Sequence, residues 1–129
     1  MNKTELMYRE IVLEHYKNPQ NYGTLLDYDL SNKEDNPLCG DEIGITIKLN
    51  NNTIFEIKFD GHGCAISQAA ASILISHVKG KTLDEVKNLS REDMLKFFGV
   101  EITPMRLKCV LLAWNVLQNA INNYGEKNE

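Results

Sequence analysis

Two neighbouring segments with a period of two residues constrain the fold more strongly than any other feature of the chain. Their apolar positions are separated by single glycines or polar residues, and they are Ile43, Ile45, Ile47 and Leu49, followed by Phe55, Ile57 and Phe59. Such alternation is typical of strands that bury one face. Residues 50–52 between the segments are all asparagine, which tolerates the left-handed backbone of a tight turn. Because two strands joined so briefly must run antiparallel, the sequence predicts a β-hairpin.

The segments on either side of the hairpin have helical patterns. A first helix is expected over residues 5–17, where acidic residues fall opposite a broad apolar face formed by Leu6, Tyr8, Ile11, Val12, Leu13 and Tyr16. It should end at Asn18, because the residue before a proline avoids the α region. A second helix is expected over residues 66–79, with Gly80 as its C-cap. This helix is rich in alanine, so it can lie close against a neighbour.

The rest of the chain completes an α+β pattern. Two capping boxes, each a Ser or Thr followed three residues later by an acid, predict short helices that start near residues 82 and 90. A long helix should follow Pro104 and end near Gly125, with an apolar stripe formed by Leu107, Val110, Leu111, Trp114, Leu117, Ile121 and Tyr124. Residues 25–30 are candidates for a short edge strand. We therefore expect a small antiparallel sheet of about three strands, covered by helices.

The bulk properties exclude several classes of protein. The formal net charge of −4 gives no electrostatic basis for nucleic-acid binding, since domains that bind phosphates usually carry a basic surplus. Acidic residues interrupt every apolar run of the N-terminal segment, whereas a signal peptide needs an apolar stretch and an organellar presequence avoids acids. No window approaches a membrane span of about 18 apolar residues. We expect a cytosolic protein with a single domain over residues 1–129.

The three cysteines are expected to be thiols or metal ligands, because disulfides are rare in reducing compartments. The alternative is that each is a small buried hydrophobic residue, as free cysteine often is. Their positions favour the first interpretation. Cys39 precedes the first predicted strand, Cys64 follows the second strand and begins a helix, and Cys109 lies in the first turn of the last helix. Thiols near helix N-termini are stabilised as thiolate, the form that binds zinc or iron and attacks sulfur.

Asp41 is the natural fourth ligand of a metal site built from these cysteines. It follows Cys39 by two residues, and Gly40 between them permits a sharp turn. Three thiolates and one carboxylate would form a tetrahedral zinc site or the anchor of an iron–sulfur cluster. The spacing alone does not identify such a site, because ligands so far apart in the sequence converge only if the fold brings them together.

Four blocks of sequence occur in a characteristic order: YREIVLEHYKNPQNYG at 8–23, NPLCGD at 36–41, FDGHGCAISQAAASI at 59–73 and TPMRLKCVLLAW at 103–114. Through these blocks nearly the whole chain resembles the U-type scaffold family of iron–sulfur cluster assembly, which includes IscU, SufU and the N-terminal domain of NifU. The resemblance implies a protein that accepts persulfide sulfur from a pyridoxal-phosphate-dependent cysteine desulfurase. It would then build a [2Fe–2S] cluster or pass sulfur on to apo iron–sulfur proteins or a carrier scaffold. The matching ligand positions are Cys39, Asp41, Cys64 and Cys109.

Local motifs resemble the SufU branch, which is described as zinc-dependent sulfurtransferases, more than the IscU branch. Lys108 stands where the IscU branch has histidine, and residues 102–106, ITPMR, replace a Leu-Pro-Pro-Val-Lys stretch that a specialised Hsp70 chaperone recognises. The insertion that SufU-like proteins typically carry between the second and third cysteines is absent. On the SufU branch the resemblance implies zinc with Cys39 as the sulfur acceptor. On the scaffold branch it implies iron or a [2Fe–2S] cluster, with Cys109 as the alternative acceptor.

Two basic residues are expected to act beside the site. Lys108 is adjacent to Cys109, where its charge could stabilise a thiolate or steer an incoming persulfide. Arg106 could contact a partner protein. The resemblance further implies a monomer or weak oligomer that pairs transiently with the desulfurase.

The remaining candidates have simpler interpretations. His62 lies two residues from Cys64, but a loop histidine between glycines is more often solvated than a ligand. His15 and His77 are expected on helices as surface or partly buried residues, and Trp114 is expected in the core. Two other functions stay open: a structural zinc domain, which the aspartate ligand disfavours because closed structural sites usually use Cys and His, and a thiol oxidoreductase, which would need a close cysteine pair.

Overall fold

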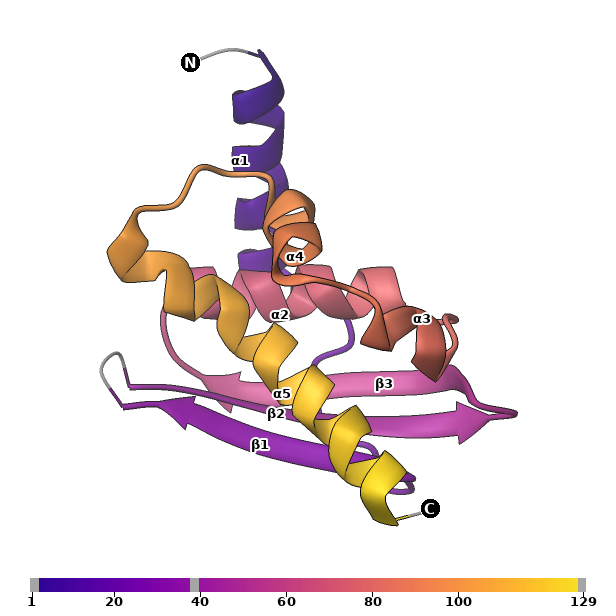
Figure 1. Cartoon of the computed structure of the whole chain (residues 1–129). Helices are drawn as coiled ribbons and strands as arrows, with labels where there is room; N and C mark the ends of the chain where they lie inside the picture. The colour runs from indigo at the N-terminus through magenta and orange to yellow at the C-terminus, as the bar shows by residue number, and fades with distance from the viewer. Residues whose placement is uncertain (1–2, 38–39, 128–129) are drawn as a thin grey trace.

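The computed structural model describes residues 3–37 and 40–127 (Figure 1). In chain order the elements are α1 (Lys3–Lys17), β1 (Leu30–Asn36), β2 (Asp41–Asn50), β3 (Thr53–His62), α2 (Ala65–Val78), α3 (Leu83–Lys87), α4 (Arg91–Phe98), the 3₁₀ turn η1 (Pro104–Arg106) and α5 (Leu107–Lys127). This order of elements confirms the predicted α+β class.

The three strands form one antiparallel sheet in the order β1-β2-β3. The predicted hairpin is β2–β3, in which Ile45 pairs with Phe59 across the ladder. Asn51 and Asn52 turn the chain with φ of +52° and +65°, which confirms the expected left-handed turn. Ile43, Ile45 and Ile47 are buried and Leu49 packs against the core while partly exposed, so the alternation of residues 43–49 correctly predicts the interior face of β2.

The predicted face of β3 is wrong at one position. Lys48 pairs with Glu56 whereas Leu49 pairs with Ile54, so the register shifts and Phe55 is the extra residue of a bulge. Phe55 is 57% exposed, and Ile54 occupies the interior position instead with no exposure. A bulge reverses the alternation on one side of it, which a strict two-residue period cannot anticipate.

The edge strand lies later than predicted. Residues 25–30 were expected to form it, but β1 begins at Leu30 and continues to Asn36. Between its buried ends the strand is polar, so its sequence lacks the apolar alternation by which a strand is predicted. The strand forms through its pairing with β2. The expected segment instead crosses the sheet as a loop, where the backbone N–H of Leu25 donates to Oγ1 of Thr46.

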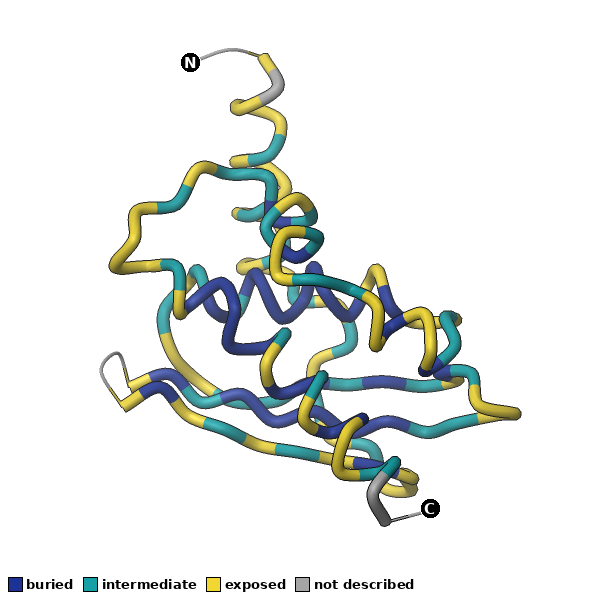
Figure 2. Tube along the Cα trace, in the orientation of Figure 1, coloured by how far each residue is buried: buried dark blue, intermediate teal, exposed yellow. Residues whose placement is uncertain are grey.

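The interior of the sheet is covered by α2 and α5, which also pack on each other (Figure 1). Figure 2 shows buried residues running along α2, along the first half of α5 and along the central strands. Ala69, Ala70 and Ala71 are fully buried, as expected for a helix that approaches its neighbour closely. The apolar stripe of α5 is confirmed, although the helix extends to Lys127 rather than ending near Gly125.

The first helix differs from its prediction in what it buries. It packs on α2 and projects away from the sheet, as Figure 1 shows. Leu6, Leu13 and Tyr16 were expected on a buried face, but they are 50%, 54% and 47% exposed. The helix also meets the C-cap of α4, where the ring of Tyr8 lies so close to Gly99 that an added side chain at Gly99 would collide with it.

The helix ends follow the capping signals. Thr82 with Glu85 and Ser90 with Asp93 both form complete capping boxes. The C-cap of α2 is Lys79 rather than Gly80, which follows it. Within residues 3–37 and 40–127, no helix combines the length and apolar character needed to cross a membrane.

Candidate metal centre

Asp41 anchors the candidate site. It is the first residue of β2 and has no solvent exposure, although its side chain is a carboxylate. Its Oδ1 accepts a 2.8 Å hydrogen bond from the backbone N–H of Cys64. Gly63 makes this approach possible, because a Cβ at that position would overlap the Asp41 carboxyl group. The strand is entered through Gly40 with φ of +71°, which confirms the expected turn.

Cys64 lies at the other side of this hydrogen bond. It is the N-cap of α2, and its Sγ accepts from the backbone N–H of Ser67 at 3.5 Å. The same sulfur lies 3.8 Å from Oδ2 of Asp41. The predicted position at a helix N-terminus is thus confirmed, and the sulfur faces both a backbone N–H of the first turn and the Asp41 carboxyl group.

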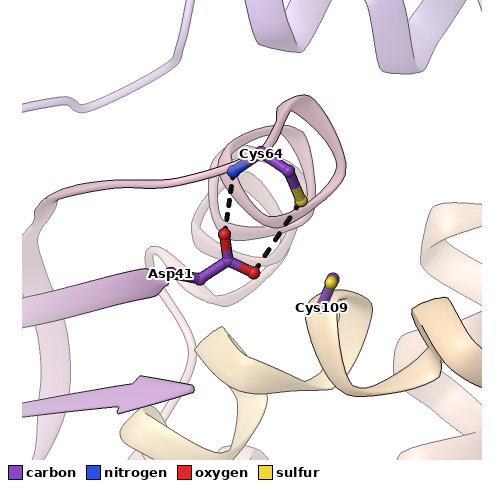
Figure 3. A group of neighbouring side chains, drawn as sticks. All are labelled: Asp41, Cys64 and Cys109. Atoms are coloured by element: carbon purple, nitrogen blue, oxygen red, sulfur yellow. Dashed lines mark hydrogen bonds between the residues drawn. The ribbon is translucent and has the colours of Figure 1, made fainter. Parts of the chain in front are cut away.

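Cys109 supplies the third donor from α5, as its third residue, with no solvent exposure. One ligand atom each of Asp41, Cys64 and Cys109 lie within 4.8 Å of one another. In Figure 3 the three side chains converge from β2, α2 and α5. These elements are distant in the sequence, so the sheet and its two covering helices create the cluster.

The donor set fits a metal that prefers sulfur and oxygen. Zinc–sulfur and zinc–oxygen bonds of about 2.3 and 2.0–2.2 Å place tetrahedral ligands about 3.5 Å apart. The 3.8 Å between Cys64 Sγ and Asp41 Oδ2 needs only a small contraction to meet this value. Two thiolates and one carboxylate leave one tetrahedral position for a fourth ligand. Cys39, the predicted fourth ligand, lies outside the described residues.

Comparison with known proteins identifies the family of the chain. A profile of the family described as "NifU-like N terminal domain" matches residues 7–129. The chain belongs to this family. Among its relatives is the zinc-dependent sulfurtransferase SufU of Bacillus subtilis (strain 168), which is 34% identical over 134 residues that cover 91% of this chain and 90% of SufU.

Other members of the NifU-like family are scaffold proteins. The iron–sulfur cluster assembly scaffold protein IscU of Escherichia coli (strain K12) is 34% identical over 128 residues, covering 96% of this chain and 98% of IscU. Among solved structures, a putative iron–sulfur cluster assembly scaffold protein for the SUF system from Fervidobacterium islandicum AW-1 superposes with a TM-score of 0.75. It has 29% identity and covers 91% of this chain and 98% of that one.

The auxiliary basic residues lie outside the donor cluster. Lys108 and Arg106 are both exposed. Lys108 lines an open groove of about 600 Å³ between the end of β1 and α5, together with Pro37 and Trp114. Pro37 is the last described residue before Cys39, the predicted sulfur acceptor.

The histidines have the simpler roles that were expected. His62 is exposed at the end of β3 and is not part of the cluster. The Nδ1 atom of His15 lies 2.7 Å from Oγ of Ser72, and His77 stacks on Phe97. Burial lowers the pKa of both His15 and His77.

Two contributors to the site escaped the sequence interpretation. Gly63 was assigned only to a bend, yet it admits the Asp41 carboxylate. Ser67 was not singled out, yet it is fully buried and contacts Cys64 through both its N–H and its hydroxyl. The sequence signal that could have identified Ser67 was its spacing. Ser67 lies three residues after the N-cap, and the side chain of an N-cap residue commonly accepts a hydrogen bond from the N–H at that position.

Proposed function

We propose that this protein is a metal-binding sulfur carrier of iron–sulfur cluster assembly that accepts persulfide sulfur from a cysteine desulfurase. The observation that carries the proposal is the convergence of Asp41, Cys64 and Cys109 within 4.8 Å. The similarity to SufU over 91% of the chain supports it. The assigned ligands are these three residues and Cys39, and zinc is the metal favoured by a tetrahedral thiolate and carboxylate set.

The metal, when bound, would keep the cysteines deprotonated and hold them in place. We assign Cys39 as the sulfur acceptor. Its thiolate attacks the outer sulfur of the desulfurase persulfide, so that a new S–S bond forms on Cys39 while the S–S bond of the desulfurase breaks. The desulfurase cysteine leaves as a thiolate, and the exchange needs no external oxidant or reductant. Lys108, which lines the same groove as Pro37, attracts the anionic persulfide.

A cluster scaffold is the second candidate function. The 34% identity to the E. coli scaffold IscU over almost the full length of both proteins favours it. In that role the same four residues would anchor a [2Fe–2S] cluster, Cys109 would be the alternative sulfur acceptor, and apo iron–sulfur proteins would receive the product. A carboxylate is a weaker ligand for iron than a thiolate, so Asp41 would keep the cluster releasable.

The experiment that tests the proposal uses protein purified from the cytosol of its host without reductant or chelator. Metal content is measured first, and the protein is then incubated with a cysteine desulfurase and cysteine. The carrier role predicts zinc, faster desulfurase turnover and a persulfide that is lost in Cys39→Ser. Zinc without sulfur acceptance would indicate a structural zinc domain, and a stable [2Fe–2S] chromophore that is lost in Cys39→Ser would indicate the scaffold.

A further inference from the structure

The backbone N–H and the hydroxyl of Ser67 both contact one residue, Cys64. Ser67 is fully buried in the first turn of α2. Its backbone N–H donates to Cys64 Sγ at 3.5 Å, and its hydroxyl oxygen lies 3.8 Å from the same sulfur. The hydroxyl proton is donated to the Cys64 carbonyl at 3.1 Å.

A hydroxyl bonded to a carbonyl in the preceding turn is common in helices and by itself implies no role at a metal site. The unusual partner here is the cap. Helices are usually capped by oxygen atoms of Ser, Thr, Asp or Asn. In this protein the capping atom is the sulfur of Cys64, which also faces Asp41 at 3.8 Å. The Ser67 N–H is therefore aimed at a candidate metal ligand.

We infer that Ser67 is a positioning residue of the metal centre, which orients the Cys64 sulfur toward Asp41 and Cys109 through its N–H and its hydroxyl. The inference rests on the proposed metal-binding function. A metal-bound thiolate has no proton to donate, so its sulfur becomes an acceptor only. The Ser67 hydroxyl is within reach of that sulfur and can turn its proton from the Cys64 carbonyl to Sγ. Groups that hydrogen-bond to metal ligands in this way fix ligand orientation and raise metal affinity.

The role also separates Cys64 from the cysteine that exchanges sulfur. A thiolate held by two donors from its own helix is restrained in position and less nucleophilic, because hydrogen bonds withdraw electron density from sulfur. Cys64 therefore serves as a fixed ligand, and the exchange of sulfur falls to a different cysteine.

The test compares Ser67→Ala with Ser72→Ala. Both residues are fully buried serines of α2, but the Ser72 hydroxyl contacts His15 and Gln20 rather than Cys64. Ser67→Ala keeps the backbone N–H and introduces the best helix former, so the apo variant should fold. Zinc affinity is measured by competition with a chromogenic chelator, and the thiolate-to-metal charge-transfer band is recorded after loading with Co²⁺. Thermal melting of each apo protein measures any loss of stability that comes from altered packing rather than from metal binding.

Ser67→Ala is expected to bind zinc about 10-fold more weakly, the size of effect typical of a group that supports a ligand. Its Co²⁺ charge-transfer band should move to lower energy, because the sulfur loses a hydrogen bond and becomes more electron-rich. Ser72→Ala should keep both the affinity and the band of the wild type. The inference is overturned if Ser67→Ala binds zinc as the wild type does, if its loss equals that of Ser72→Ala, or if the band does not move. Failure of the wild type itself to bind zinc or Co²⁺ would instead overturn the proposed function.

Discussion

The backbone N–H of Cys64 donates to Oδ1 of Asp41 at 2.8 Å, which joins the start of α2 to the start of β2. This hydrogen bond leaves Oδ2 of Asp41 facing the Cys64 sulfur at 3.8 Å. A single carboxylate therefore has one oxygen that fixes the backbone and one oxygen available to a metal. Substitutions at Asp41 can separate these two uses of its oxygen atoms.

Asp41→Asn keeps an oxygen for the Cys64 N–H but removes a buried negative charge. The apo variant should be at least as stable as the wild type, because burying an ionised carboxylate is unfavourable. Asp41→Ala also loses the hydrogen bond, so it should be less stable than Asp41→Asn by about 1–2 kcal/mol. Urea unfolding of the apo proteins measures both differences, and both variants should bind zinc more weakly. Equal stability of the two variants would show that the hydrogen bond contributes nothing.

Gly63→Ala should disrupt the site more than a glycine replacement elsewhere. Its added Cβ would overlap the Asp41 carboxyl group, and φ at this position is +148°. Gly80→Ala is the matched control, because Gly80 also has a positive φ, +91°, but open space around it. Gly80→Ala should cost about 1–2 kcal/mol of stability through backbone strain alone and leave zinc affinity unchanged. Gly63→Ala should cost more and weaken zinc binding, and parallel behaviour of the two variants would contradict the proposed packing at Asp41.

How far the sequence predicted the fold depends on where each element obtains its stability. The hairpin was predictable because β2 carries its own apolar alternation. The bulge at Phe55 and the late start of β1 were not, because both are set by pairing with β2 rather than by the local pattern. The exposure of Leu6, Leu13 and Tyr16 on α1 was missed for a related reason. The sequence predicts an apolar helix face, but it does not predict how much of that face a neighbouring element covers.

In the candidate site too, local features were predictable and long-range contacts were not. The position of Cys64 at a helix N-terminus could be predicted from its neighbours, since a bend and a helix follow one another in the sequence. The proximity of Asp41 and Cys109 could not, because it depends on how α5 crosses the sheet. Only the resemblance to a known family joined them before the structure did. Ser67 was missed because its one signal, the spacing of three residues after the N-cap Cys64, would be the same for any residue that supplies a backbone N–H at that position.

Acidification should destabilise the fold in two steps. Burial lowers the pKa of His15 and His77 below the ordinary value of 6.5, so the unfolded chain binds more protons than the native state. The contribution of the two neutral histidines to the free energy of unfolding is complete above pH 6.5. It is lost as the pH falls through their lower native pKa values. Backbone N–H groups of the capping boxes lower the pKa of Glu85 and Asp93 below 4.5 and 3.8, which adds a second loss in more acidic solution. Urea unfolding from pH 8 to 3 measures both steps.

His15→Gln tests the first of these steps. The variant should show a smaller loss of stability between pH 7 and 5 than the wild type, since one of the two titrating groups is gone. Its loss at more acidic pH should be unchanged, because the capping boxes remain. An identical pH profile above pH 5 would contradict a lowered pKa of His15.

Lys108→Ala should slow sulfur transfer without weakening zinc binding. Lys108 is exposed at the groove that reaches Pro37, so its charge acts on the incoming persulfide or desulfurase rather than on the metal. A surface charge beside a docking site mainly changes the association rate, and a slowing of about 3- to 10-fold at low salt is expected. Lys96→Ala, an exposed lysine of α4, is the control. A rate unchanged from the wild type in Lys108→Ala would rule out this role.

In the proposed metal centre, three cysteines and one aspartate bind one metal ion. X-ray absorption spectroscopy of the zinc-loaded protein can test this ligand set, because it reports the number and type of ligand atoms. We expect three sulfur atoms at about 2.3 Å and one oxygen at about 2.0 Å, with one sulfur lost in Cys39→Ser and the short oxygen distance lost in Asp41→Ala. A shell that contains histidine nitrogen, or one that keeps three sulfur atoms in Cys39→Ser, would contradict it.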